Sequence, residues 1–299
     1  MQRFFFQRLL PVAVLAALFS LTACQKDVDV TSELTPDGTA TQRNQVFYGV
    51  SQFNGALVPS RVFEINQGSG LITAAFSPTV NGTGAVITDI RGICYLGSGI
   101  KYAIMTGPNN GAGVPNNALM TLNVNTQEAF FVSTSTVGTV SDIDYDPLTG
   151  NIYGLRGNDL VIIDGPSGLQ TYSTVAIQGL GGQSARGLTM IGDVNLGTQI
   201  NIASTTGGVA GTTQVRKVDP ATGVTGFIAT LLPGNQLNGG NCGLGYQLTP
   251  NSQLFVNRTN GGAGFGLNNT AWPNQGNVFT AVWGAAGVNF DDLSSDVGQ

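Results

Sequence analysis

Three aspartates at alternate positions are the first residues in this sequence whose types and spacing could do chemistry. The segment DIDYDPLTG contains Asp142, Asp144 and Asp146. Carboxylates so close together could bind a cation, but a calcium loop of the EF-hand type needs Gly at its sixth position and Glu at its twelfth. Counted from Asp142, those positions hold Pro147 and Tyr153. The EF-hand pattern is therefore absent.

A tight turn is the other interpretation of this segment. DPLTG, which starts at Asp146, has a counterpart in DPATG, which starts at Asp219. In such a sequence Asp accepts backbone hydrogen bonds, Pro presets φ, and Gly takes the position with positive φ. Period-2 alternation also places all three aspartates on one face of a strand rather than around a cation. The sequence therefore predicts two equivalent turns.

Glycoside hydrolysis is a second chemistry that aspartates could perform, since it needs two carboxyl groups facing one site. The candidates lie at or near the starts of the inner strands of the repeat described below; they are Asp89, Asp142, Asp291 and Asp292. The alternative, which we favour, is that these aspartates accept hydrogen bonds from backbone groups where the chain begins each sheet.

The sequence contains no histidine, which removes Ser-His-Asp and Cys-His nucleophile systems and imidazole metal sites. GQSARG resembles a nucleophile elbow only loosely and has no base to serve it. The Gly-rich GLGGQ precedes no predicted helix and is not a phosphate loop. We therefore predict no catalytic residue, no cofactor and no metal.

The N-terminus indicates an export signal. Arg3 and Arg8 precede an apolar run from Leu9 to Ala23, which suits a signal-peptide core and is shorter than the roughly 20 residues of a membrane span. The run ends in LTAC, which resembles the lipobox of bacterial lipoproteins and implies a lipid on Cys24. An ordinary secretory signal that contains a cysteine is the alternative. Several acyl chains on Cys24 would hold the protein on a membrane.

The residues after Cys24 indicate a compartment. QKDVD resembles the signal that sends lipoproteins to the outer face of the outer membrane in one group of Gram-negative bacteria, although Val28 interrupts its acidic run. We expect a signal peptide at 1–23, a flexible tether at 24–44 and a folded domain at 45–299. The predicted location is the outer membrane, exposed at the cell surface.

Charge and cysteine content limit the partners. Without Arg3 and Arg8 the chain keeps ten basic residues against 17 acidic ones, a net charge of −7, which argues against nucleic acid. The domain holds only Cys94 and Cys242, which do not make a disulfide framework. We predict that these two cysteines are unpaired and that the protein is a monomer.

A repeat of about fifty residues organises the domain. Glycine is 43 of 299 residues, about twice the usual share, and short β-branched runs alternate with turn residues, which indicates an all-β chain. Each repeat begins with Gly or Asp followed by an aliphatic residue, and these aliphatic residues are Ile93, Ile143, Leu188, Leu244 and Leu293. Up to three further strands follow each. Four strands in such a period are typical of a β-propeller.

The two ends of the domain complement each other. VFYGV at 46–50 matches a second strand without a first, and FDDLSSD at 290–296 matches an inner strand with nothing after it. We therefore predict five four-stranded blades, with the chain ends paired in one blade to close the ring. In the blade before it, spacing favours GFGLN at 264–268 as the third strand and NVFTAVW at 277–283 as the fourth.

The lipobox, the acidic tether, the VFYGV opening and the DPxTG turns together resemble bacterial lipoprotein propellers of unknown function. The resemblance covers residues 45–299 and implies a fold and a compartment. That family offers no catalytic residue to transfer.

Propeller geometry gathers the longest connections on one face. They are 106–117 and 204–213, with the linkers around 78–88 and 233–241. Long loops on a rigid scaffold are typical of binding, although Gly-rich loops also tolerate drift. The candidate binding residues at the channel mouth are Asp89, Arg91, Asn109, Asn110, Asp142, Arg186 and Asp291.

Three functions follow from these observations. The first is a membrane-anchored, non-enzymatic propeller that binds a glycan or a protein. The second is a carbohydrate-active enzyme that uses the same aspartates. The third is a passive surface-coat or adhesion module. A closed Arg–Asp mouth would favour the first, and an Asp pair with a raised pKa beside an open cleft would favour the second.

Overall fold

The computed structural model describes residues 46–51, 55, 59–66, 71–97, 101–164, 170–193, 197–206, 213–230, 243–247, 253–257, 264–268, 280–281 and 290–295. They belong to one compact unit, Arg43–Gln299. Within these ranges no helix has the length and apolar character of a membrane span. The predicted signal peptide, the tether, Cys24 and Cys242 lie outside the described residues.

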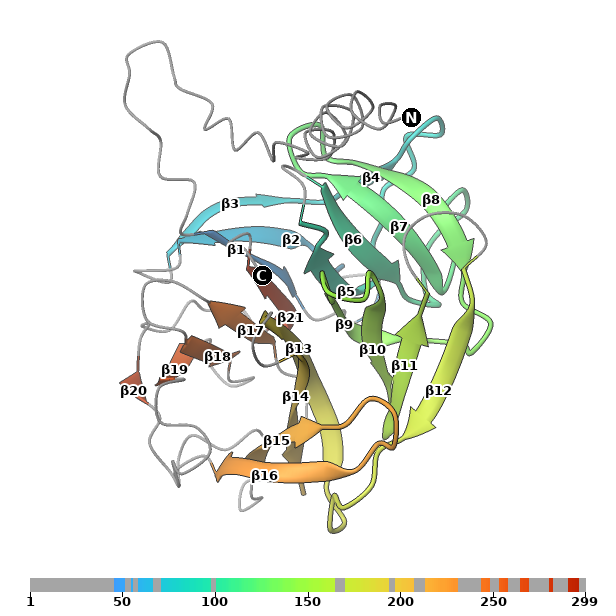
Figure 1. Ribbon diagram of the computed structural model, residues 1–299. Helices are drawn as coiled ribbons and strands as arrows, with labels where there is room; N and C mark the ends of the chain where they lie inside the picture. The colour runs from blue at the N-terminus through green and yellow to red at the C-terminus, as the bar shows by residue number, and fades with distance from the viewer. Residues whose placement is uncertain are drawn as a thin grey trace, which may run out of the picture. The chain divides into compact units, whose positions relative to one another are not determined.

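The described strands form five sheets around a central axis (Figure 1). One sheet contains β21 (Phe290–Ser295), β1 (Val46–Ser51), β2 (Val62–Asn66) and β3 (Ile72–Phe76). The next contains β5 (Ile90–Tyr95), β6 (Lys101–Thr106), β7 (Ala118–Asn123), β8 (Glu128–Thr134) and β4 (Thr79–Val80). The third contains β9 (Ser141–Tyr145), β10 (Ile152–Arg156), β11 (Asp159–Ile163) and β12 (Tyr172–Ala176).

The remaining two sheets follow the same order from the axis outward. One contains β13 (Ser184–Asp193), β14 (Gly197–Thr205), β15 (Thr213–Val218) and β16 (Thr225–Thr230). The other contains β17 (Leu244–Gln247), β18 (Gln253–Asn257), β19 (Gly264–Asn268) and β20 (Thr280–Ala281). The fold is an all-β propeller, as the repeat predicts.

The predicted strand count is wrong for one sheet. Four-stranded sheets number four among the described residues, and the β5 sheet has a fifth strand, β4. This strand is part of the linker that leaves β3, and it pairs in parallel with the outer strand β8 through Thr79 and Val80. An isolated parallel bridge between Gln178 and Val224 repeats the arrangement at β16. A two-residue pairing has no periodicity, so the sequence pattern could not reveal it.

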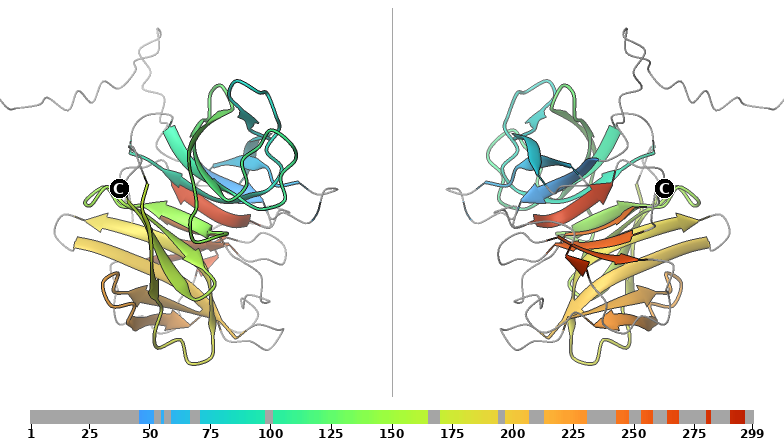
Figure 2. Two further views of the ribbon diagram at one scale, coloured as in Figure 1. Left: turned by 90° about the vertical axis from the view of Figure 1, so that its right-hand side faces the viewer. Right: turned by 90° about the vertical axis from the view of Figure 1, so that its left-hand side faces the viewer.

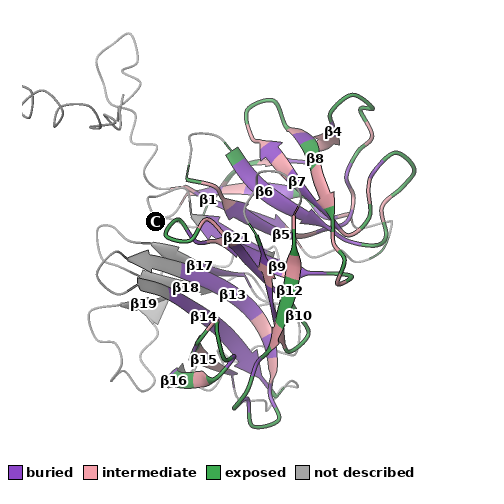
Figure 3. Ribbon diagram, turned by 45° about the vertical axis from the view of Figure 1, so that its right-hand side comes forward, coloured by how far each residue is buried: buried purple, intermediate pink, exposed green. Residues whose placement is uncertain are grey.

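Period-2 alternation explains how the sheets stack. In β6, Tyr102 and Ile104 pack in one cluster with Val50 of β1, whereas Ala103 and Met105 pack in another with residues of the β9 sheet. The β5 sheet therefore buries one face against the sheet before it and the other against the sheet after it, as stacked repeats do. Figure 3 shows the result: the strands near the axis are buried, and the outer strands β8, β12 and β16 are partly exposed.

The two ends of the domain meet as predicted. β21 pairs antiparallel with β1, from Phe47 opposite Ser295 to Ser51 opposite Phe290, and these two strands lie side by side in Figure 2. Phe290 and Leu293 are both 1% exposed and pack in one cluster with Phe47 and other residues of this sheet. The prediction that 290–295 supply the inner strand of this sheet is confirmed.

The sheet that the sequence described least clearly is also as predicted. The segment GFGLN forms β19, which pairs with β18. β20, Thr280–Ala281, lies within NVFTAVW and pairs with β19. These two strands are the predicted third and fourth strands.

The two DPxTG segments form the same turn. The amides of Gly150 and Gly223 donate to the carbonyls of Asp146 and Asp219, at 2.7 and 2.8 Å. The carboxylates of the two aspartates accept the amides of the residues two positions later, at 3.0 and 2.8 Å. Both glycines have positive φ, 77° and 71°. The turn prediction is confirmed.

Alanine at the two turn glycines should have unequal effects. The shared positive φ costs any L-residue about 1–2 kcal/mol. A Cβ on Gly150 would meet nothing within 4 Å, whereas one on Gly223 would lie 2.1 Å from the carbonyl oxygen of Ala176. Denaturant unfolding should therefore show that Gly223→Ala loses clearly more stability than Gly150→Ala. Equal losses would contradict the packing of this turn against β12.

Candidate site at the mouth of the propeller axis

A β-bulge interrupts the start of four inner strands in the described part of the chain. The pairing register skips Arg91 in β5, Asp142 in β9, Arg186 in β13 and Asp291 in β21. A bulge leaves one residue without a cross-strand partner and often re-aims its side chain beside a functional site. All four residues are charged and are among those predicted for the channel mouth. The register thus gives them one shared backbone feature; the side chain of Asp291 lies outside the described residues.

The residue before the repeated aliphatic position is small or acidic in every inner strand, and the space around it is crowded at Gly92 and Gly243. It is glycine in three inner strands, at 92, 187 and 243, and aspartate in two, at 142 and 292. A Cβ on Gly92 would lie 2.9 Å from Cγ1 of Ile143 and 3.2 Å from Oδ2 of Asp292. A Cβ on Gly243 would lie 2.5 Å from Cγ of Leu293. The absence of a side chain at Gly92 therefore leaves room for the carboxyl group of Asp292, and its absence at Gly243 leaves room for Leu293.

Asp292 links three inner strands. Its Oδ2 accepts the amides of Ile93 in β5 at 2.6 Å and of Ile143 in β9 at 3.1 Å. Its Oδ1 accepts the amide of Leu293 at 2.7 Å. The residue is 0% exposed. This aspartate therefore satisfies backbone groups, which is the structural role that we favoured for the inner-strand aspartates.

Asp144 and Ser294 make similar links. Oδ2 of Asp144 accepts the amide of Met190 at 2.7 Å and the hydroxyl of Thr189 at 2.9 Å, which joins β9 to β13. Oγ of Ser294 accepts the amide of Tyr95 at 2.8 Å, which joins β21 to β5. The candidate set for binding omitted Asp144 and Asp292. Asp292 was among the aspartates considered for hydrolysis, and its alignment with the glycine of the repeat is the signal that separates it from the binding residues.

Asp142 is the exception among these carboxyl groups. It is 1% exposed and has φ of 52°, a conformation that costs a non-glycine residue energy. Its oxygens accept no hydrogen bond of normal geometry within the described residues. Burial and then the charge of Asp292 raise the pKa of Asp142 well above its ordinary value, although the nearby amide of Leu188 opposes the rise. Burial also raises the pKa of Asp292, against the amides of Ile93 and Ile143.

A second network surrounds Asp89, just before β5. Nε of Arg91 lies 2.6 Å from Oδ1 of Asp89, and the arginine side chain is 20% exposed. Oδ2 of Asp89 accepts the backbone and side-chain N–H groups of Asn109, both at 3.0 Å. The charge of Asp89 is therefore compensated by a neighbouring cation and two amide donors. This is the closed Arg–Asp pair that distinguishes the binding hypothesis.

Asn110 fixes the connection between β6 and β7. Its Oδ1 accepts the amides of Thr88 and Asp89, both at 2.9 Å. Its Nδ2 donates to the carbonyls of Asp89 at 3.0 Å and Gly107 at 3.1 Å. A Cβ on Gly107 would lie 2.3 Å from the carboxyl carbon of Asp89, so only glycine fits there. The first turn of the 107–117 loop is thus held against the start of β5.

Four of the predicted residues therefore form one network: Asp89, Arg91, Asn109 and Asn110. Asp142 lies in a second group of residues at the axis, together with Asp292. Arg186 is partly exposed, and its buried Nε has no hydrogen-bond partner in the described part of the chain. Within the same residues, no three Asp, Glu, His or Cys side chains are arranged to hold a metal ion.

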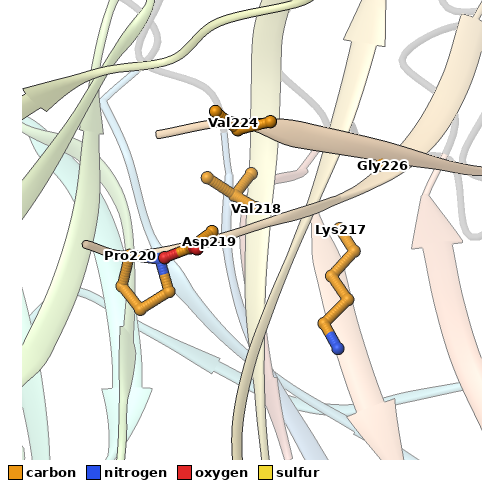
Figure 4. Close-up of a pocket in the computed structure, with 6 residues that line it drawn as sticks. All are labelled: Lys217, Val218, Asp219, Pro220, Val224 and Gly226. Carbon is orange, nitrogen blue, oxygen red and sulfur yellow. The ribbon is translucent and has the colours of Figure 1, made fainter. Parts of the chain in front are cut away.

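A cavity of about 430 Å³ lies elsewhere, at the turn between β15 and β16 (Figure 4). It is lined by Lys217, Val218, Asp219, Pro220, Val224 and Gly226. The lining is the second DPxTG turn and its flanks. None of the predicted site residues contributes to it.

Comparison with known proteins gives structural neighbours at low sequence identity. No protein-family model matches the chain, and no curated protein matches it. A structure of a nidogen/laminin complex is 11% identical, with a TM-score of 0.47 over 85% of this chain and 99% of the other. A functionally unknown protein from Desulfotomaculum acetoxidans is 10% identical, with a TM-score of 0.43 over 81% and 97%.

A periplasmic gluconolactonase of Pseudomonas aeruginosa is 11% identical, with a TM-score of 0.41 over 84% of this chain and 69% of the other. At these scores the neighbours assign no activity to this protein. The description of the chain as a propeller accordingly rests on its own strand pairing.

Proposed function

We propose that this protein is a membrane-anchored lipoprotein whose propeller binds a polar ligand at the mouth of its axis and does not transform it. The observation that carries the proposal is the fixed start of the 107–117 loop. Asp89, Arg91 and the two asparagines hold it through charged and amide hydrogen bonds. A loop that is already ordered loses little conformational entropy on binding.

The groups available at this mouth favour an acidic glycan as the ligand. Asn109 is exposed, and Arg91 and Arg186 are partly exposed. Amide and guanidinium groups donate hydrogen bonds to hydroxyl and carboxylate oxygens, and guanidinium pairs best with carboxylate. A protein ligand is the alternative that the test below distinguishes.

The anchor in this proposal is a lipid on Cys24, followed by the 24–44 tether and the 45–299 domain as a monomer at the outer membrane. The LTAC sequence and the apolar run before it support the anchor. A tether between the membrane and a rigid propeller would leave the loop face accessible to ligands.

Arg186→Ala should weaken ligand binding strongly. The purified full chain would be applied to an array of neutral and acidic glycans, and the affinity for the best acidic glycan would then be measured. A hydrogen bond to a charged group contributes about 1.5–3 kcal/mol, so the loss should be roughly tenfold to a hundredfold. Lys101→Ala is the matched control, because Lys101 is an exposed cation at the first-to-second strand turn, on the opposite face.

Three results would reject parts of the proposal. If no acidic glycan on the array is bound and the chain captures a protein instead, the ligand is a protein and not a glycan. Equal affinities of Arg186→Ala and wild type would remove the site. The Cys24→Ser variant should not hold labelled glycan on the cell membrane. If cells that produce it retain as much glycan as wild-type cells, the lipid anchor is refuted.

A glycoside hydrolase is the second candidate, and the adjacent carboxyl groups of Asp142 and Asp292 with raised pKa values favour it. Their burial, at 1% and 0% exposure, argues against it, because a substrate must reach both groups. The glycans that bind should be assayed for release of reducing sugar. Release that disappears in Asp142→Asn would establish the enzyme instead of the binding protein.

A further inference from the structure

The buried carboxyl groups of Asp142 and Asp292 at the axis are not needed for ligand binding at the mouth, and their surroundings indicate a separate role. Asp292 accepts three backbone N–H groups, at 2.6, 3.1 and 2.7 Å. Asp142, equally buried, accepts none of normal geometry within the described residues. Several N–H donors favour the charged form of a carboxyl group, and a buried carboxyl without donors favours the neutral acid. The two neighbours are therefore suited to different protonation states.

We propose that the axis of the propeller is a proton-binding site, in which Asp142 holds the proton and its O–H group donates a hydrogen bond to the carboxylate of Asp292. The two carboxyl groups are neighbours, because Oδ2 of Asp292 accepts the amide of Ile143, the residue next to Asp142, at 3.1 Å. One proton satisfies both: it removes the buried charge of Asp142 and gives Asp292 a further donor. The pair then carries one negative charge, compensated by the amides of Ile93, Ile143 and Leu293.

A metal cation fits this position less well than a proton. The amides that converge on Asp292 point their positive ends toward it, so a cation beside that carboxylate would be repelled by the same groups. Among the residues that the structure describes, no set of three ligating side chains is arranged for a metal. A proton needs only one oxygen from each of two neighbouring carboxyl groups.

The surrounding charges oppose the loss of this proton. Asp144 on β9 adds a negative charge that raises the pKa values of Asp142 and Asp292. On β5, Cys94 is a buried neutral thiol, because burial raises its pKa well above the ordinary value, and Arg91 is paired with Asp89. Arg186 is the charged residue of β13 nearest the mouth in sequence register. None of these cations is a described hydrogen-bond partner of the pair.

Ionisation of Asp142 would therefore place two like charges side by side at the joint of the ring. Asp292 belongs to β21, the strand that joins the chain ends, and its carboxylate also holds β5 and β9. Asp142 is the bulge residue at the mouth. A rise in pH that ionises Asp142 therefore destabilises the pair and weakens the ring closure that depends on Asp292.

The test is the melting temperature of the full chain at a series of pH values, with Asp142→Asn as the variant. The amide of asparagine can donate to Asp292 but does not titrate. A raised pKa in the folded state means that the native protein keeps a proton that the unfolded chain releases above about pH 4. From there up to the folded-state pKa, wild type should lose roughly 3–5 °C per pH unit relative to Asp142→Asn.

Asp159→Asn is the control, because Asp159 is partly exposed and paired with Arg156, and it should keep the wild-type pH dependence. A wild-type slope in Asp142→Asn would overturn the proposal. If that variant does not fold, infrared spectra of wild type with isotope-labelled aspartate decide the question at pH 7. A protonated carboxyl band at that pH supports the site, and its absence refutes it.

Discussion

Deletion of residues 290–299 is expected to abolish cooperative unfolding of the propeller rather than to loosen one sheet. β21 is the inner strand of the sheet that contains β1, and it also contacts β5, β9 and β17. Its removal exposes the edge of β1 and takes Phe290 and Leu293 out of the core. Burial of each such side chain contributes about 1.5–3 kcal/mol, against a typical total stability of about 5–15 kcal/mol.

The hydrogen bonds of β21 add to this loss. The amides of Ile93 and Ile143 would lose the carboxylate of Asp292, and the amide of Tyr95 would lose the hydroxyl of Ser294. Buried donors without partners cost about 1–3 kcal/mol each. The deletion therefore removes a free energy comparable to the whole stability of a typical domain.

The measurement is thermal and denaturant unfolding of the deletion variant, with deletion of 296–299 as the matched control. The control removes C-terminal residues and leaves β21 intact, so it should unfold like wild type. A 290–299 deletion that melts cooperatively at the wild-type temperature would show that the ring does not depend on this strand.

Glycine substitutions at the two axial aspartates should have opposite consequences. Asp292→Gly removes the acceptor of three buried amides and should cost about 3–5 kcal/mol. Asp142→Gly removes a buried carboxyl that accepts no hydrogen bond of normal geometry, and it relieves the positive φ of a non-glycine residue. It should be neutral or stabilise the protein by about 1 kcal/mol at pH 7.

The pair of variants is well matched, because three other inner strands have glycine at this position and the chemical change is the same. Urea unfolding at pH 7 gives both free energies. Similar losses in the two variants would mean that Asp142 has partners as important as those of Asp292, and the proton-binding site would then lose its structural basis.

The two networks also separate the functional hypotheses. Arg186→Ala tests the mouth and should leave the pH dependence of stability unchanged. Asp142→Asn tests the axis and should leave the loop network of Asp89 and Asn110 in place. A protein that binds an acidic glycan normally but shows no protonated carboxyl would keep the proposed function and lose the axial proton site.

The sequence by itself determined the parts of this protein that depend on local pattern. Alternating residues with turn signals every few positions predict where strands begin and end, so the inner-strand repeat, the DPxTG turns and the third and fourth strands after Asn257 were predictable. The match between the VFYGV and FDDLSSD segments predicted the pairing of the chain ends. The charged residues of the mouth were predictable because they stand within two residues of the repeated aliphatic position, although the bulges themselves were not predicted.

Only the tertiary structure decided what those residues touch. The contact between Asp292 and Ile93 joins positions 199 residues apart, and no periodicity encodes which backbone amide a carboxylate will meet. The parallel pairing of β4 with β8 also depends on tertiary structure, because it forms where a linker passes a neighbouring sheet. Asp142 and Asp292 have the same side chain and the same place in the repeat. Their chemistry differs because three amides converge on one of them and none of normal geometry reaches the other.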